Sequence, residues 1–251
     1  TILRDGIDMT PAEYYAHLRS CHKLPTTSQP SPELFEQFYL EAVAAGDEVL
    51  GIFLSNELSG TLQCAKLAAD LANVDNVMFV DSASVCMGQA LLVLLAARLR
   101  DSGKTLVQIA TALEHAKKHL HVVAAVDDLK YLRKGGRLPA AVAVAGGMLG
   151  IKPIVTVKEG KVALAGKARG LPGAYVALFK KIDELGGVCP DFPAREGYTA
   201  SLREVQPIEA YFRDTLHLPQ PLVCQIGCVI GTHTGPGTFG FAFFDKGLAL
   251  E

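Results

Sequence analysis

Residues 48–120 alternate between short apolar segments typical of buried strands and longer segments with helical spacing. The expected strands are 48–54 and 77–80, and the expected helices are 60–72, 85–99 and 105–120. Strands separated by helices of this length are typical of parallel βαβ units, because a parallel connection must cross back over the sheet. Two earlier helices are expected to open at Thr10 and at Ser31, each followed by proline. This part of the chain therefore predicts a small α/β domain.

The second half has a different pattern, with short glycine turns such as Glu159-Gly160 between apolar segments. Hairpins of this kind require antiparallel pairing. The expected strands are 121–126, 151–157, 162–168, 198–202, 223–230 and 239–244, and the expected helices are 140–149, 173–185 and 204–215. We therefore expect an α/β fold of two domains, a parallel-sheet domain over 1–117 and a larger antiparallel-sheet α+β domain over 118–251.

Composition excludes several classes of protein. Of the 251 residues, 49% are hydrophobic and 20% are charged, which is typical of a folded globular chain. The net charge of −2 offers no basic field for nucleic acid. The longest apolar run, 90–97, is too short to span a membrane, and no signal peptide is visible. Six cysteines lie mostly in apolar segments, so we expect reduced thiols and a cytoplasmic protein.

Two hydroxyl-rich segments precede expected helices. In 25–32, PTTSQPSP, the prolines hold the chain extended and leave Thr27 and Ser28 free to bind a ligand. In 54–61, LSNELSGT, Ser59 occupies the expected N-cap, and the backbone N–H groups of Gly60 and Thr61 would face an anion. The plain alternatives are a capped linker for the first segment and an ordinary helix cap for the second.

A third segment, GTHTGPGTFGF at 231–241, interrupts an expected hairpin. His233 lies between two threonines, and Gly235 and Gly237 flank a proline. We interpret His233 as a ligand contact. The glycines allow a positive φ angle or a close approach to the backbone, and we expect them to let the ligand reach the backbone. Arg169 is a weaker candidate as a counter-ion, and the basic loop 134–137 is interpreted as a solvated loop.

Metal and cofactor chemistry has little support. His115 and His119 share a helix face with lysines around them, and no acidic partner is expected near them or His121, so no metal site is expected. No cofactor is expected, since the full P-loop motif GxxxxGK[ST] and the GxSxG motif are absent from the sequence. Thr27, Ser59 and His233 are neutral donors from distant segments of an otherwise apolar chain. Such residues suit a pocket that holds a carboxylate at its mouth and an alkyl chain inside.

Five motifs carry a resemblance: LPTTSQPSP, SNELSGT, DDLKYLRKGGRL, GMLGIKPIV and GTHTGPGTFG occur in the order found in the DegV family of bacterial fatty-acid-binding proteins. The resemblance implies the two-domain DegV fold with a long-chain fatty acid bound between the domains. It also implies a non-enzymatic protein that presents the acyl carboxylate to an ATP-dependent fatty acid kinase, which makes acyl-phosphate for phospholipid synthesis. A transient contact with a membrane belongs to the same expectation.

By motif, the resemblance assigns Thr27, Ser59 and His233 to the carboxylate, with Arg169 as a nearby basic residue. The complete set of expected ligand contacts is Thr27, Ser28, Ser59, Gly60, Thr61, Arg169, His233 and Thr234. Two departures stand out. Family members begin with a strand and an Asp-Ser loop before the segment that matches 1–5, and DFPAREG at 191–197 has no clear match.

Two other functions remain open from the sequence. A serine hydrolase could use Ser59 as nucleophile and His233 as base, but no feature beyond Asp81 offers the acid that would orient the histidine. A structural or regulatory binding module would hold no lipid at all.

Overall fold

The computed structural model describes residues 2–139 and 150–249, so the helix expected at 140–149 lies outside the described residues. The chain divides into two compact units. The larger unit contains Thr1–Thr27, His121–Lys158 and Val162–Glu251, and the smaller contains Ser28–Leu120 with Glu159–Lys161. This division differs from the expected one at the N-terminus, because Thr1–Thr27 groups with the C-terminal half of the chain.

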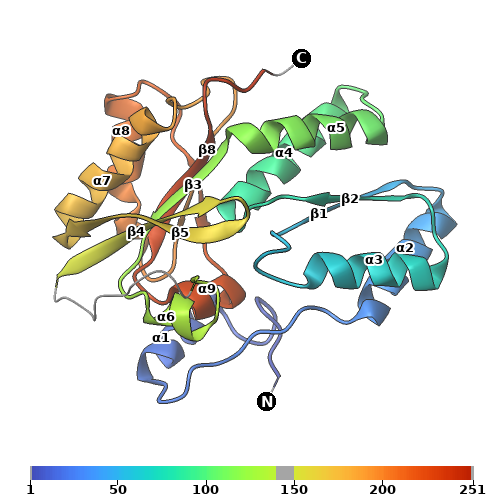
Figure 1. The fold of residues 1–251 in the computed structure, drawn as a ribbon, viewed down its shortest axis with the longest axis horizontal. Coiled ribbons are helices and arrows are strands. Elements are labelled where there is room, and N and C mark those ends of the chain that lie inside the picture. Colours follow the sequence, from blue (N-terminus) through green and yellow to red (C-terminus); the bar gives the residue numbers. More distant parts are fainter. Residues whose placement is uncertain (1, 140–149, 250–251) are drawn as a thin grey trace. The chain divides into compact units, whose positions relative to one another are not determined.

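The smaller unit contains the parallel pair that the alternating pattern predicts. Its elements are α2 (Pro32–Ala45), β1 (Val49–Phe53), α3 (Thr61–Ala72), β2 (Val77–Asp81), α4 (Met87–Asp101), α5 (Leu106–Ala116) and the 3₁₀ turn η1 (Lys117–His119). β1 and β2 are parallel, with Val49 opposite Val77 and Phe53 opposite Asp81. Figure 1 shows this unit as two strands with helices on both faces.

Residues alternate between the two faces of this small sheet. Tyr39 of α2 and Ala68 of α3 are buried on one face, with Phe79 of β2 packed against them. Successive strand residues point to opposite faces, so Ile52 and Val80 face the other side, where α4 and α5 contact the strands. Because helices cover both faces of this sheet, the sequences of β1 and β2 are mainly apolar rather than alternating between apolar and polar residues.

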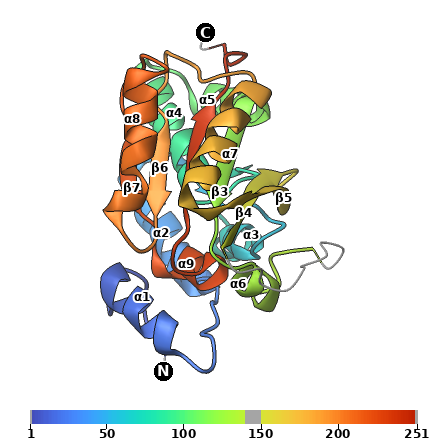
Figure 2. The ribbon, with the colours of Figure 1, turned by 90° about the vertical axis from the view of Figure 1, so that its left-hand side faces the viewer.

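The larger unit is built on six strands. Its elements are α1 (Pro11–Ser20), β3 (Leu120–Ala125), α6 (Lys130–Lys134), β4 (Ile151–Lys158), β5 (Lys161–Arg169), α7 (Gly170–Glu184), β6 (Arg195–Tyr198), η2 (Leu202–Glu204), α8 (Gln206–Asp214), β7 (Leu222–Gln225), α9 (Cys228–Thr234) and β8 (Phe239–Phe244). The strand order is β5-β4-β3-β8-β6-β7 (Figures 1 and 2). β3–β4 and β6–β8 are antiparallel, whereas β6–β7 is parallel. The expected combination of a small parallel sheet and a larger, mainly antiparallel one is confirmed.

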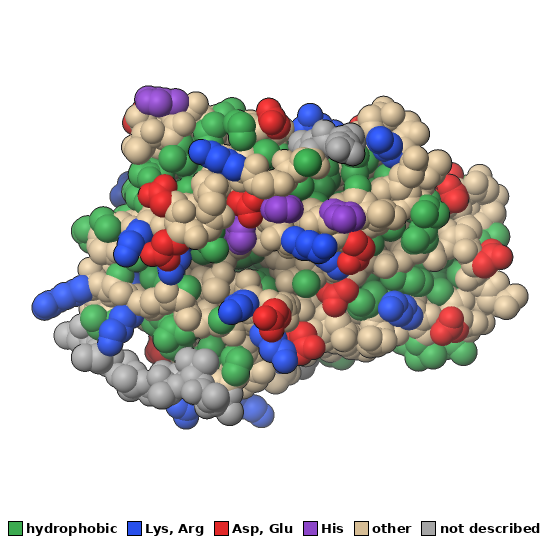
Figure 3. All heavy atoms as spheres, turned by 45° about the horizontal axis from the view of Figure 1, so that its top comes forward, with side chains coloured by type: hydrophobic (Ala, Val, Ile, Leu, Met, Phe, Trp, Pro, Cys, Tyr) green, Lys and Arg blue, Asp and Glu red, His purple; other side chains and the backbone are tan. Residues whose placement is uncertain are grey.

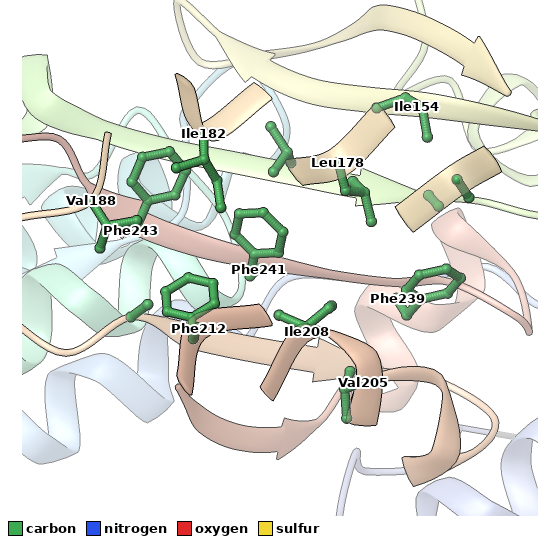
Figure 4. Packing of buried hydrophobic residues seen from close by; sticks show 14 residues of the cluster. Ile154, Leu178, Ile182, Val188, Val205, Ile208, Phe212, Phe239, Phe241 and Phe243 are labelled. Carbon is green, nitrogen blue, oxygen red and sulfur yellow. The ribbon is translucent and has the colours of Figure 1, made fainter. Parts of the chain in front are cut away.

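The core of the larger unit lies between β8 and two helices. Phe239, Phe241 and Phe243 alternate along β8 and are each 0% exposed. They pack against Leu178 of α7 and Phe212 of α8, as Figure 4 shows. Burying a phenylalanine side chain stabilises a fold by about 1.5–3 kcal/mol, so this strand anchors both helices.

One expected strand is wrong in its second half. The apolar segment 223–230 was expected to be extended, but only Leu222–Gln225 is a strand, and Cys228–Thr234 forms α9. The carboxylate of Asp5 accepts hydrogen bonds from the backbone N–H groups of Cys228 (2.9 Å) and Val229 (3.0 Å). These bonds cap the first turn of α9, which would otherwise have unpaired donors.

Charge is mixed on the surface. On the face drawn in Figure 3, Lys and Arg side chains alternate with Asp and Glu among the described residues. None of the helices in residues 2–139 and 150–249 combines the length and apolar character needed to cross a membrane.

Candidate functional site

His233 lies in the last turn of α9 and pairs with Thr27. The His233 Nε2 atom is 2.9 Å from the Thr27 hydroxyl oxygen. The other ring nitrogen, Nδ1, is buried and has no hydrogen-bond partner among the described residues. Burial lowers the pKa of His233 to about 4, and the positive charge of Arg137 acts in the same direction. The imidazole is therefore neutral at neutral pH.

The hydrogen-bond pattern favours one tautomer of His233. A neutral imidazole has one N–H donor and one acceptor nitrogen. A proton on Nδ1 would be a buried donor without an acceptor, and unpaired buried N–H groups are rare because of their cost. A proton on Nε2 can instead be donated to the Thr27 hydroxyl oxygen. The Thr27 O–H group then remains able to donate to a ligand oxygen.

Helix α9 is fixed by the first helix of the chain. The Tyr14 hydroxyl lies 2.5 Å from the Thr232 hydroxyl, and the Tyr15 hydroxyl donates to the Ile226 carbonyl at 2.7 Å. The Thr234 hydroxyl bonds to the Ile230 carbonyl at 3.2 Å, within the same helix. The hydroxyl groups of Thr232 and Thr234, which flank His233, therefore both stabilise α9.

The expectation that Gly235 and Gly237 leave space for a ligand is wrong. Both have positive φ angles, +78° and +80°. A Cβ atom on Gly235 would lie 2.3 Å from the Tyr131 ring, and one on Gly237 would lie 2.1 Å from the Asp127 carboxylate. Other parts of the protein already occupy that space. The glycines are needed for close packing and for the left-handed backbone.

The basic residues near this group differ from those expected. Arg137, interpreted from the sequence as part of a solvated loop, is half-buried, and its charge acts on His233. Its Nη1 atom donates to the Gly135 carbonyl at 2.6 Å. Arg169 is exposed at the N-cap of α7, and within the described residues no hydrogen bond joins it to Thr27 or His233. No sequence pattern distinguished Arg137 from the neighbouring surface residues.

In the smaller unit, the Ser59 hydroxyl caps α3. It accepts a hydrogen bond from the Thr61 backbone N–H at 3.3 Å and lies 2.8 Å from the Thr61 hydroxyl. The N-cap itself is Gly60, one residue later than expected. A Cβ atom on Gly60 would lie 2.5 Å from the Gln29 side-chain oxygen, so Gln29 packs beside Ser59 and Gly60. No sequence pattern had indicated Gln29. Ser28 is exposed.

Buried serines lie in the loops that follow β1 and β2, and the sequence analysis did not predict that these loops meet. Ser55, Ser82 and Ser84 are 0%, 1% and 4% exposed. The Ser55 N–H donates to the Ser84 carbonyl at 2.7 Å, so the loops that follow β1 and β2 are joined. The neighbouring residues Ala83 and Cys86 have positive φ angles of 47° and 54°, a conformation that non-glycine residues seldom adopt.

One histidine of the expected surface cluster has an acidic partner. His121 Nε2 lies 2.7 Å from an oxygen of Asp245, a residue 124 positions away in the sequence. The interpretation that these histidines lack an acidic neighbour is therefore wrong for His121. Across the described part of the chain, no three His, Cys, Asp or Glu side chains are grouped so that they could hold a metal ion.

Comparison with known proteins places these observations in a family. Residues 1–246 match a family model described as "Uncharacterised protein, DegV family". A DegV domain-containing protein of Deinococcus radiodurans is 35% identical over 245 residues, which are 96% of this chain and 85% of the relative. One from Caldanaerobacter subterraneus is 33% identical over 246 residues, 97% of this chain and 86% of the relative.

Solved structures agree with the sequence relatives. A fatty-acid-binding DegV family protein from Thermus thermophilus superposes with a TM-score of 0.88 at 35% identity, covering 98% of this chain and 88% of the other. A stearic acid-binding protein from Eubacterium ventriosum has a TM-score of 0.82 at 26% identity, covering 96% and 85%. The chain therefore belongs to the DegV family.

Proposed function

We propose that this protein binds a long-chain fatty acid and that the Thr27–His233 pair holds its carboxylate. The observation that carries this proposal is the neutral, half-buried His233 bonded to Thr27, whose hydroxyl can donate to a carboxylate oxygen. The relatives from Thermus thermophilus and Eubacterium ventriosum, described as binding a fatty acid and stearic acid, support the ligand class.

Neutral donors suit this task. A carboxylate bound by the Thr27 hydroxyl group stays ionised, and the Arg137 charge nearby adds attraction. The acyl chain supplies most of the affinity, since each buried methylene contributes about 0.8 kcal/mol, or on the order of 10 kcal/mol for sixteen carbons before ordering costs. Ser28, Ser59, Gly60, Thr61, Arg169 and Thr234 remain proposed contributors, each to be tested by its own variant.

We further propose that the protein is not an enzyme by itself and presents the carboxylate to an ATP-dependent kinase. In that reaction a carboxylate oxygen bonds to the γ-phosphorus of ATP, the bond to the β-phosphate oxygen breaks, and ADP leaves. The carboxylate is already a nucleophile, so the binding protein only has to orient it. The acyl-phosphate would then be available for phospholipid synthesis.

The hydrolase alternative is not favoured. Ser59 bonds to Thr61 in the cap of α3, and the His233 Nε2 atom is paired with Thr27. A nucleophilic serine needs a base at hydrogen-bond distance, with a third group that orients the base. The His233 Nδ1 atom has no such orienting group among the described residues.

Native mass spectrometry of the freshly purified protein tests the proposal. We expect a mass increment of a long-chain fatty acid, reduced in Thr27→Val. Thr111→Val is the matched control, because the exposed Thr111 hydroxyl also makes one hydrogen bond, to the Val107 carbonyl in α5. Ligand-free protein from cells supplied with fatty acid would contradict the proposal, and equal loss in both variants would remove Thr27 from the site.

A further inference from the structure

Two segments of the larger unit contact each other at three successive positions. On one segment the contact residues are Asp127, Tyr131 and Gly135, each four residues after the one before, from the chain preceding α6 to its C-cap. Their partners are Gly237, Gly235 and His233, which recur every two residues around the end of α9. The two segments run in opposite directions along this contact, and α6 and α9 are neighbours in Figure 1.

The spacing follows from helix geometry. Residues four apart lie on one face of a helix, so Tyr131 of α6 and Gly135 at its C-cap share a face, and Asp127 in the segment before α6 extends the same contact. At the first two positions a side chain on this face meets a glycine of the α9 segment, with Cβ distances of 2.1 and 2.3 Å. At the third position the glycine and the side chain change places. The glycine is Gly135 at the end of α6, and the side chain that meets it is His233 of α9. A Cβ atom on Gly135 would lie 2.2 Å from His233 Nδ1.

Gly135 is not required by its own backbone. Its φ angle is −74° and its ψ angle is −6°, which any residue adopts. The neighbouring Gly136 has a φ angle of +72° and open space around a built Cβ. The positive φ angle therefore accounts for a glycine at position 136, whereas the closeness of the His233 ring accounts for a glycine at position 135.

We propose that Gly135 is a positioning residue for His233, and that the face formed by Asp127, Tyr131 and Gly135 holds the imidazole where Nε2 meets Thr27. Ion pairing between Asp127 and Lys152 of β4 anchors this face to the sheet. The inference rests on the proposed role of His233 in carboxylate binding, but its own test does not need a ligand.

A double-mutant cycle gives the first test. Gly135→Ala should lower the Tm by roughly 2–10 °C, as overpacking in a protein of this size does. In a His233→Ala background the same change should cost little, because the ring that opposes the new methyl group is gone. A built Cβ is also 3.1 Å from the Tyr131 carbonyl, but that contact is present in both backgrounds and cancels. Equal losses of Tm in both backgrounds would overturn the proposal.

The titration of His233, followed by NMR, gives the second test. We expect a pKa near 4 in the unmodified protein and a rise toward the ordinary 6.5 in Gly135→Ala, because the displaced ring becomes hydrated. Gly136→Ala removes a neighbouring glycine without touching the ring, so His233 should titrate as in the unmodified protein. A pKa that stays near 4 in Gly135→Ala would contradict the positioning role. If Gly135→Ala does not fold, the double variant must still fold for the proposal to stand.

Fatty acid retention is measured separately in the same variants. Ligand-free unmodified protein would reject the proposed function and leave the cycle and the titration to decide the role of Gly135. Fatty acid bound normally by Gly136→Ala and up to roughly ten- to hundredfold more weakly by Gly135→Ala would support both proposals.

Discussion

Glu196 of β6 and Glu209 of α8 bring two carboxyl groups together in the larger unit. Glu196 lies opposite Phe241 in the antiparallel ladder, so its side chain points to the sheet face that α8 covers. It is 0% exposed, no N–H or O–H group of the described residues donates to either of its oxygens, and the carboxyl group of Glu209 is close enough to share a hydrogen bond with it. Burial, reinforced by the charge of Glu209, raises the pKa of Glu196 to about 8. The side chain is therefore protonated at neutral pH.

The first prediction is a loss of stability as pH rises from about 4.5 to about 8. In the unfolded chain Glu196 loses its proton near pH 4.5, whereas in the folded protein it keeps the proton until about pH 8. The free energy of unfolding should therefore fall as pH rises between these values, by at most about 1.4 kcal/mol per pH unit, and level off above pH 8. Urea unfolding at pH 5 to 9 measures this slope.

Glu196→Gln should flatten that slope, because a neutral amide has no proton to lose, and Glu209→Gln should reduce it. Arg213, one turn further along α8, already pairs with Asp214 and remains in every variant. Glu184→Gln is the control, since the pKa of this exposed glutamate is lowered by Lys181. A slope that survives in Glu196→Gln would mean that another group takes up the proton.

The second prediction concerns the cap on α9. Burial acts to raise the pKa of Asp5, but hydrogen bonds from Val229 and Cys228 outweigh it, so the pKa is lowered. Asp5→Ala should cost about 0.5–2 kcal/mol of stability at pH 7, as the loss of an N-cap does. The Asp5 contribution is present above the unfolded pKa of 3.8 and disappears as pH falls through the lower folded value.

Chemical unfolding of Asp5→Ala at pH 7 measures this cost. Asp101→Ala is the control, because Asp101 forms an exposed pair with Arg100, and such pairs contribute little. An Asp5→Ala protein as stable as Asp101→Ala would show that α9 does not depend on this cap.

The third prediction separates the two causes of the low His233 pKa. Burial is the larger cause and the charge of Arg137 is the smaller, so Arg137→Gln should raise the His233 pKa only part of the way from about 4 toward 6.5. Arg133→Gln removes an exposed positive charge from α6, four residues before Arg137, and should leave the titration unchanged. An NMR titration of the His233 ring protons compares the two. A complete return to 6.5 would make the charge, not burial, the main cause.

Local signals in the sequence predicted local structure well. The helices expected to open at Thr10 and Thr105 are α1 and α5, and the pairs Thr10–Glu13 and Thr105–Gln108 form capping boxes there. The apolar segments 48–54 and 77–80 predicted two buried strands in a parallel arrangement, and the parallel pair β1–β2 confirms this. These signals depend on residues within a few positions of one another, which a single sequence displays directly.

The errors share a physical cause, which is a partner far away in the sequence. Helix α9 is capped by Asp5, more than 220 residues earlier, so its β-prone residues predicted a strand. Gly235 accommodates Tyr131, and His121 meets Asp245, each over a separation of more than 100 residues. His233 and Thr27 were both chosen from the sequence, but only the structure shows that they bond to each other.

The last prediction concerns what His233 does for the ligand. Without His233 the Thr27 hydroxyl loses the partner that orients its O–H group toward the carboxylate. Losing a hydrogen bond to a charged group costs about 1.5–3 kcal/mol, several times less than burial of a sixteen-carbon chain contributes. His233→Ala should therefore weaken fatty acid binding by roughly ten- to hundredfold and still retain ligand. The carboxylate itself should lose its fixed orientation. NMR of fatty acid labelled with ¹³C at the carboxyl carbon should show one pH-independent signal in the unmodified protein and a titrating signal in His233→Ala. Acyl-phosphate formation with a partner kinase should fall further than affinity does, because transfer requires orientation as well as binding. Thr27→Ala should change both measurements in the same direction. If His233→Ala empties the protein of ligand while the remaining bound fraction is phosphorylated normally, His233 supports the fold of the site and does not orient the carboxylate.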